Sequence, residues 1–146
     1  MAKRILVVDD EVRILTVVQK RLESVGYEVI TAQNGMDGLR RAREESPDLI
    51  VLDLIMPNIS GYHVCGVLKR DITYKHIPIL MLTARSQEKD IQQGIEAGAD
   101  AYMTKPFDHA ALLAQIADLL AKGEEAKKAV DEARQLEKEI GRSPET

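Results

Sequence analysis

The sequence has few aromatic residues, a single cysteine and no long hydrophobic run. Of 146 residues none is Trp, one is Phe and four are Tyr, so a core must rest on Val, Ile, Leu and Ala. Cys65 has no second cysteine with which to form an internal disulfide, which fits a reducing compartment. Only four apolar residues, 5–8, separate the basic start from Asp9, too few for a signal-peptide core or a membrane span. We therefore expect a cytoplasmic protein without a membrane contact.

Basic charge is also in short supply. Twenty Lys and Arg stand against 24 Asp and Glu, which gives a formal net charge of −4. No basic stripe of the kind that binds nucleic acid is visible, so we expect no direct contact with nucleic acid. Hydrophobic residues make up 45% of the chain, which is enough for one core in a chain of this length.

Short β-branched runs alternate along the chain with segments of helical period. The runs predicted as strands are residues 5–8, 28–32, 49–52, 78–82 and 101–103. The segments predicted as helices, with apolar residues three or four apart, are 11–25, 34–45, the stretch after Gly61, 87–97 and 108 onward. Strands that are each followed by a helix predict an α/β fold with a doubly wound, five-stranded parallel sheet and five helices. Ligands bind such sheets beyond the carboxyl ends of the strands, so the residues that follow strands are the candidates for a site.

The last 24 residues, 123–146, differ in composition from the rest. They include seven acidic and five basic residues and no aromatic residue. The spacing of Glu124 and Lys128 supports a helix, so we expect the helix that starts near residue 108 to run past Gly123. A thin apolar seam recurs every three or four residues: Ala126, Ala129, Ala133, Leu136 and Ile140. We place one domain over residues 1–122 and a charged helical extension or linker over 123–146, which is either a solvated helix or a short coiled coil.

Polar residues stand at or just beyond the ends of four predicted strands. Asp9 and Asp10 follow the first, Asp53 the third, Thr83 the fourth and Lys105 the fifth. Each has an ordinary explanation by itself, as a helix cap, a turn residue or a surface charge. Together they fall on the rim where a parallel sheet binds ligands. Three carboxylates at one rim are costly unless a cation compensates them, and oxygen ligands of this kind suit Mg²⁺.

Four motifs resemble, in order and spacing, the receiver domain of response regulators in two-component signalling. They are Ile-Leu-Val-Val-Asp-Asp-Glu (5–11), Leu-Ile-Val-Leu-Asp-Leu-Ile-Met-Pro (49–57) with Gly61, Met-Leu-Thr-Ala (81–84) and Gly-Ala-Asp-Ala-Tyr-Met-Thr-Lys-Pro-Phe (98–107). The resemblance covers most of the chain, residues 3–122. It implies a flavodoxin-like fold with strand order 2-1-3-4-5 and a cis peptide bond between Lys105 and Pro106.

The resemblance implies that Asp53 accepts a phosphoryl group from a phosphohistidine donor in a Mg²⁺-dependent reaction. Asp10, Asp53 and the backbone carbonyl of Ile55 would bind the metal, and Asp9 would act through water. In this interpretation the chain is a signalling domain that catalyses only its own phosphorylation and dephosphorylation.

Three further residues receive roles from the same resemblance. Lys105 would pair with a phosphoryl oxygen, and Thr83 would donate its hydroxyl to the phosphoryl group once it is attached. Tyr102 would then rotate into the space that the Thr83 loop vacates. Such a movement biases an element with two states and so acts as a switch.

The resemblance also implies partners. A cognate histidine kinase or phosphotransfer protein would supply the phosphoryl group. An output partner would bind the face formed by the fourth helix, the fifth strand and the fifth helix, to which Ile91, Ile95, Tyr102 and Leu112 could contribute. A homodimer is expected either through that face or through the C-terminal helix.

Two other functions fit parts of the pattern. Mg²⁺-dependent phosphohydrolases also form an aspartyl phosphate on an α/β sheet, but they typically carry Asp-x-Asp after the first strand and a cap domain. This chain has adjacent Asp9 and Asp10 and no length for a cap. A degenerate receiver would bind partners without phosphorylation. Against this interpretation, the chain has all five polar residues at the strand ends: Asp9, Asp10, Asp53, Thr83 and Lys105.

Overall fold

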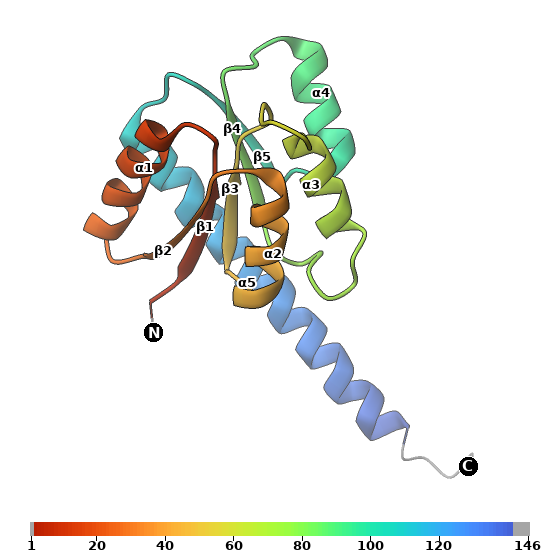
Figure 1. Cartoon of the computed structure of the whole chain (residues 1–146). Coiled ribbons are helices and arrows are strands. Elements are labelled where there is room, and N and C mark those ends of the chain that lie inside the picture. The colour runs from red at the N-terminus through yellow and green to blue at the C-terminus, as the bar shows by residue number, and fades with distance from the viewer. Residues whose placement is uncertain (1, 142–146) are drawn as a thin grey trace.

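The computed structural model describes residues 2–141 and arranges them as a parallel sheet between two layers of helices (Figure 1). The strands are β1 (Arg4–Val8), β2 (Glu28–Ala32), β3 (Leu49–Leu52), β4 (Ile79–Thr83) and β5 (Ala101–Thr104). The helices are α1 (Val12–Ser24), α2 (Gly35–Glu45), α3 (Gly61–Lys69), α4 (Glu88–Ala97) and α5 (His109–Ile140). Every neighbouring pair of strands is parallel, in the order β2-β1-β3-β4-β5. The predicted doubly wound sheet with five helices and its strand order are confirmed.

The central strands are apolar throughout because helices cover the sheet on both faces. Successive side chains of a strand point to opposite faces, so β1 contributes to two separate clusters. Ile5 and Val7 pack with residues of α1 and α5, whereas Leu6 and Val8 pack with residues of α2 and α3. Figure 1 shows the same two layers. The core therefore holds the carboxyl ends of β1, β3 and β4 at one edge of the sheet.

The observed boundaries differ from the predicted ones by at most one residue. Asn34 and Asp108 are N-caps and not the first helical residues; their side chains accept hydrogen bonds from the N–H groups of Asp37 and Ala111. β4 ends with Thr83 rather than before it, since the Lys105 N–H donates to the Thr83 carbonyl at 2.8 Å and extends the ladder. Sequence periodicity predicts that an element exists better than it predicts its last residue.

Helix α5 is much longer than the others and projects beyond the body of the domain (Figure 1). It passes Gly123 without a break, and a Cβ there would lie 3.1 Å from Pro78 Cγ, so the absent side chain lets the helix run close to that proline. The predicted helical extension is confirmed as far as Ile140. The expectation for 142–146 lies outside the described residues, and a domain boundary at residue 122 stays a prediction.

The half of α5 that packs on the sheet uses one stripe of side chains. Leu112 and Ile116 are fully buried, and Leu119 is nearly so. The prediction that Leu112 contributes to an output face is therefore wrong, because its place in this stripe directs it into the core. Ile95 of α4, by contrast, is 56% exposed.

Among the helices of residues 2–141, none combines the length and the apolar character needed to cross a bilayer.

Candidate functional site

Three carboxylates meet at the carboxyl ends of β1 and β3. The two strands are neighbours, and the Asp53 N–H donates to the Val8 carbonyl at 3.0 Å, which aligns their ends. One carboxylate oxygen from each of Asp9, Asp10 and Asp53 lies within 4.8 Å of the others. Asp9 and Asp53 are buried, with 2% and 5% of their surface exposed, whereas Asp10 is exposed. The predicted convergence of the three acids is confirmed.

Lys105 enters this cluster from the end of β5. Its Nζ donates to Asp9 Oδ2 at 2.7 Å and lies 3.5 Å from Asp53 Oδ2. The peptide bond to Pro106 is cis, as the resemblance implied. Burial alone would lower the pKa of the Lys105 ammonium, but the hydrogen bond to Asp9 and the charges of Asp53 and Asp9 raise the pKa overall. Lys105 is thus held in its charged form inside the cluster.

The surroundings of Asp53 make the ionised form of its carboxyl unfavourable. Burial raises its pKa, and the negative charge of Asp9 raises it further. Lys105, the Thr83 hydroxyl and the Ile55 N–H, which lies 3.5 Å from Asp53 Oδ1, lower the pKa without cancelling the rise. One ammonium against three carboxylates leaves two negative charges uncompensated. The cluster therefore has the oxygen donors and the excess negative charge that fit a hard divalent cation.

The loop after Asp53 depends on a glycine. A Cβ on Gly61 would lie 2.2 Å from the Asp53 carbonyl oxygen, so only glycine can start α3 this close to the site. The Gly61 N–H donates to the Leu54 carbonyl at 2.9 Å and closes the loop. Ile55 lies within this loop with 49% of its surface exposed. That the Ile55 carbonyl is a metal ligand stays a prediction.

The predicted switch residues Thr83 and Tyr102 both contact the backbone of Arg85. Thr83 is fully buried, and its Oγ1 accepts from the Arg85 N–H at 3.3 Å. The Tyr102 hydroxyl donates to the Arg85 carbonyl at 2.7 Å. The loop between β4 and α4 is thereby connected to the site on one side and to β5 on the other.

Sequence reasoning missed a second tyrosine beside this loop. The Tyr62 hydroxyl of α3 donates to the Asp90 carbonyl at 3.0 Å, in the first turn of α4. A Cβ on Gly94 would approach ring atoms of both Tyr102 and Tyr62, so the two rings lie against the same glycine of α4. A tyrosine after a helix-starting glycine has no distinguishing pattern in the sequence, so nothing there indicated this contact.

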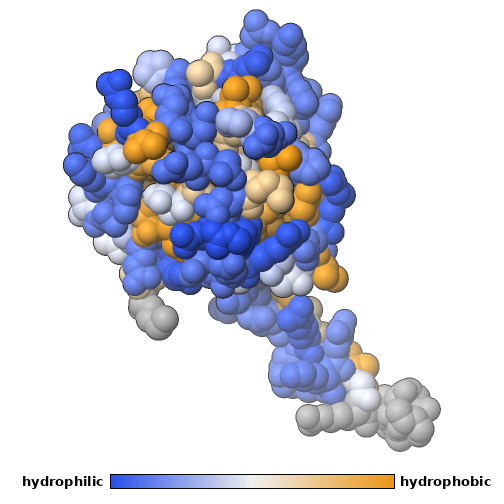
Figure 2. All heavy atoms as spheres, viewed as in Figure 1, coloured by the Kyte–Doolittle hydropathy of each residue, from blue (hydrophilic) through white to orange (hydrophobic). Residues whose placement is uncertain are grey.

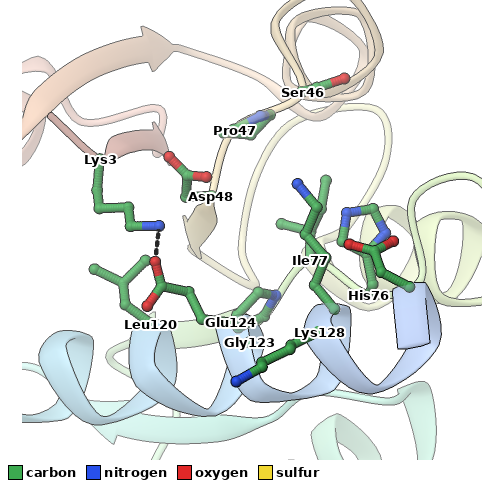
Figure 3. A pocket seen from close by; sticks show the side chains of 13 residues that line it. Lys3, Ser46, Pro47, Asp48, His76, Ile77, Leu120, Gly123, Glu124 and Lys128 are labelled. Carbon is green, nitrogen blue, oxygen red and sulfur yellow. Dashed lines mark ion pairs between the residues drawn. The ribbon is translucent and has the colours of Figure 1, made fainter. Parts of the chain in front are cut away.

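A cavity of about 520 Å³ lies at the opposite end of the sheet, between α5 and the starts of the strands (Figure 3). Lys3 and Glu124 form an ion pair across it, and the Asp48 carboxylate accepts from the Arg4 N–H at 2.8 Å. None of the site residues predicted from the sequence lines it.

Comparison with known proteins gives the family. The family model described as the response regulator receiver domain matches residues 5–117. The alkaline phosphatase synthesis transcriptional regulatory protein PhoP of Bacillus subtilis is 48% identical over 124 residues, which are 85% of this chain and 51% of PhoP. Response regulator PleD of Caulobacter vibrioides is 40% identical over 137 residues, 94% of this chain and 29% of PleD. This chain therefore spans about half of PhoP and less of PleD.

Solved structures agree. A CheY-like response regulator receiver domain protein from Methanospirillum hungatei superimposes with a TM-score of 0.81 at 30% identity, covering 86% of this chain and 99% of that one. The chain belongs to the response regulator receiver domain family. The role of that family in two-component signalling is to accept a phosphoryl group, which favours the receiver interpretation over the phosphohydrolase one.

Proposed function

We propose that Asp53 is the phosphoacceptor of this receiver domain. The observation that carries the proposal is the buried Asp53 carboxylate between Asp9 and the Lys105 ammonium. An Asp53 oxygen attacks the phosphorus of a phosphohistidine and forms an acyl phosphate. The P–N bond breaks, and its electron pair stays on the imidazole nitrogen, which takes up a proton. Later attack by water releases inorganic phosphate and regenerates the carboxylate, so the domain catalyses only reactions of its own side chain.

The metal in this proposal is Mg²⁺, held by Asp10, Asp53 and the backbone carbonyl of Ile55. When bound, it offsets the repulsion between the carboxylates and the incoming phosphoryl oxygens. Asp9 acts through water, which fits its contacts: Oδ2 accepts from Lys105 and Oδ1 accepts from the Glu11 N–H at 2.9 Å. Both oxygens of Asp9 are thus already in use within the protein.

Lys105 and Thr83 receive the phosphoryl group in this proposal. The 3.5 Å between Lys105 Nζ and Asp53 Oδ2 lets the ammonium pair with an oxygen of a group attached there. Thr83 Oγ1 accepts from the Arg85 N–H, and its own hydrogen, which now lowers the pKa of Asp53 as a hydrogen-bond donor, can donate to a phosphoryl group attached there. A shift of Thr83 toward the phosphoryl group displaces the Arg85 backbone and breaks its hydrogen bond with Tyr102, which then rotates.

The partners follow from the family role. A histidine kinase or phosphotransfer protein is the proposed donor, and an output partner is proposed to bind the face of α4, β5 and α5 around Ile91, Ile95 and Tyr102. A homodimer through that face or through the C-terminal helix stays a prediction.

The experiment is incubation with acetyl phosphate and Mg²⁺, followed by mass spectrometry of the intact protein. One added phosphoryl group is expected, lost in Asp53→Ala and in the presence of EDTA. Asp118→Ala, at an exposed position of α5, is the matched control and should keep the adduct. No adduct on the wild-type protein would favour a degenerate receiver, and bulk turnover of phosphoesters would favour a hydrolase.

A further inference from the structure

A groove runs between the part of α5 beyond Gly123 and the loop that connects α3 to β4. We call it the basic groove; its cavity of about 560 Å³ adjoins the cavity of Figure 3, with which it shares lining residues. Figure 1 shows this loop beside the place where α5 leaves the body of the domain. The charged and large apolar residues that line the groove are Ile72, Lys75, Lys127, Val130, Asp131 and Arg134.

The loop forms one wall of the basic groove, and hydrogen bonds fix its backbone. The Asp71 carbonyl accepts from the N–H groups of Tyr74 and Lys75 at 3.0 and 2.8 Å. The Asp71 carboxylate accepts from the Thr73 N–H at 2.9 Å. This turn leaves Ile72 80% exposed, the largest exposed fraction among the large hydrophobic side chains of residues 2–141. A hydrogen-bonded turn therefore holds an apolar side chain in water, which is typical of a surface that contacts a partner.

Helix α5 forms the other wall and places an apolar residue between two cations. Lys127, Val130 and Arg134 are three and four residues apart, so they lie on one face of the helix along about 10 Å of its axis. Val130 is 47% exposed. Figure 2 shows the projecting helix as mainly hydrophilic with hydrophobic side chains along it. A segment that lies along this face meets positive charge on both sides of an apolar contact.

The cations of the basic groove are not neutralised by the rest of the molecule. Within residues 2–141, no ion pair includes Lys75, Lys127 or Arg134. Asp131 is the one acid among the lining residues, so three positive charges face one negative charge. The whole chain has a formal net charge of −4, which makes this excess of positive charge local. Charge complementarity therefore favours a partner with carboxylates.

We propose that the basic groove binds an acidic segment of a partner protein, in which carboxylates lie on both sides of a large apolar side chain. The apolar side chain packs between Ile72 and Val130, and the carboxylates pair with Lys127 and Arg134. Both walls are formed before binding, so little conformational freedom is lost. Nucleic acid fits less well, because no Phe, Tyr or Trp on which bases could stack lines the groove. The proposal adds a second surface to the output face and does not depend on phosphorylation of Asp53.

Fluorescence anisotropy of the full, unphosphorylated chain tests the charges. The probe is a fluorescein-labelled peptide of sequence Glu-Asp-Leu-Glu-Asp-Leu-Glu-Asp, which should bind with a dissociation constant of about 0.1 mM, as expected of a small contact. Arg134→Glu should weaken binding about tenfold or more, because it sets like charges against each other. Lys122→Glu is the matched control: it makes the same change of charge at an exposed position of the same helix that lines neither cavity. Its affinity should stay within about twofold of the wild type.

Two further changes test the apolar contact. Ile72→Ser should weaken binding about fivefold, because it removes apolar surface that the peptide covers. Val25→Ser, at a position that is 54% exposed and lines neither cavity, should leave the affinity unchanged. A second peptide with serine in place of both leucines should bind the wild type about fivefold more weakly or worse.

Several results would overturn the proposal. One is the absence of peptide binding at about 1 mM protein. Another is an equal loss from Arg134→Glu and Lys122→Glu, or equal binding of the leucine and serine peptides, because the groove would then attract any anion. Tighter binding of a single-stranded oligonucleotide with the net charge of the peptide would point to nucleic acid instead and would also contradict it.

Discussion

The two ends of the parallel sheet treat charge in opposite ways. At the carboxyl end, Asp9 and Asp53 are almost completely buried, and the Lys105 side chain is only 12% exposed. At the amino end, Lys3 and Glu124 meet with 36% and 62% of their side chains exposed. Both ends contain an ion pair between a lysine and an acid, but only the first keeps its charges away from water.

The difference shows where a charged side chain reduces the stability of the fold and where it has almost no effect on that stability. Water screens the pair of Lys3 and Glu124, and pairs of this kind contribute little to stability. At the buried end, removing one charge leaves others without compensation, because the low dielectric strengthens every interaction there. A cluster that is costly to maintain and unbalanced in charge is typical of a site that binds a cation or reacts.

The largest effect is expected from Lys105→Met. The change leaves Asp9 and Asp53 facing each other without their cation, so we expect the free energy of unfolding to fall by about 2–3 kcal/mol in EDTA. Urea unfolding followed by circular dichroism measures this, and Mg²⁺ should restore part of the loss. Lys122→Met is the matched control: it removes an exposed ion pair with Asp118, whose atoms lie 3.0 Å apart against 2.7 Å for Lys105 and Asp9. Similar losses from the two changes would show that the buried end is not special.

A smaller effect of opposite sign is expected from Asp53→Asn. The raised pKa of Asp53 means that ionising this carboxyl costs stability in the folded state. Below the unfolded-state pKa, Asp53 is protonated in both states and this cost is absent. As pH rises through the higher folded-state pKa, the carboxyl ionises and the folded state loses that stability. Asp53→Asn should therefore raise the free energy of unfolding by about 1 kcal/mol at pH 7 in EDTA, and by less at acidic pH.

Urea unfolding at several pH values checks this expectation, with Asp118→Asn as a control at an exposed position. Added Mg²⁺ should stabilise the wild type more than Asp53→Asn, because the variant lacks one proposed ligand. A variant less stable than the wild type at every pH would contradict the unfavourable position assigned to the Asp53 charge.

The smallest effect is expected at the amino end. Lys3→Ala, Glu124→Gln and the double change should leave the urea midpoint close to the wild-type value, because the pair is screened by water. Repeating the measurement at high salt should make no further difference. Any loss comparable to that of Lys105→Met would remove the contrast between the two ends.

The elements of the fold could be predicted because they depend on local patterns. Runs such as 5–8 and 49–52 are apolar at every position, which predicts strands covered on both faces. Gly26 and Pro47 follow the ends of the first two helices and indicate where those helices stop. Each helix begins a few residues after its strand. The acids directly after the predicted strands could also be identified as site candidates, because the carboxyl ends of parallel strands lie at one edge of the sheet.

The contacts of the site could not be predicted by the same means. Lys105 donates a hydrogen bond to Asp9, which lies 96 residues earlier in the chain, and no local sequence pattern predicts a contact over that separation. Leu112 was assigned to the wrong side of its helix, because the face that meets the sheet is set by how α5 docks. The two tyrosine contacts around the β4–α4 loop depend likewise on helices from different parts of the chain.

By itself, the sequence determined the order of strands and helices, the long last helix and the polar residues at the rim, all of which depend on neighbouring residues. Its four motifs also identified the receiver family and, through it, the strand order and the assignment of Asp53. Only the tertiary structure decided which acid Lys105 contacts, how deeply Asp53 is buried and which side of α5 stays uncovered. Burial and distance are properties of the packed chain, and they turn an ordinary strand-end aspartate into a carboxylate with a raised pKa beside a lysine.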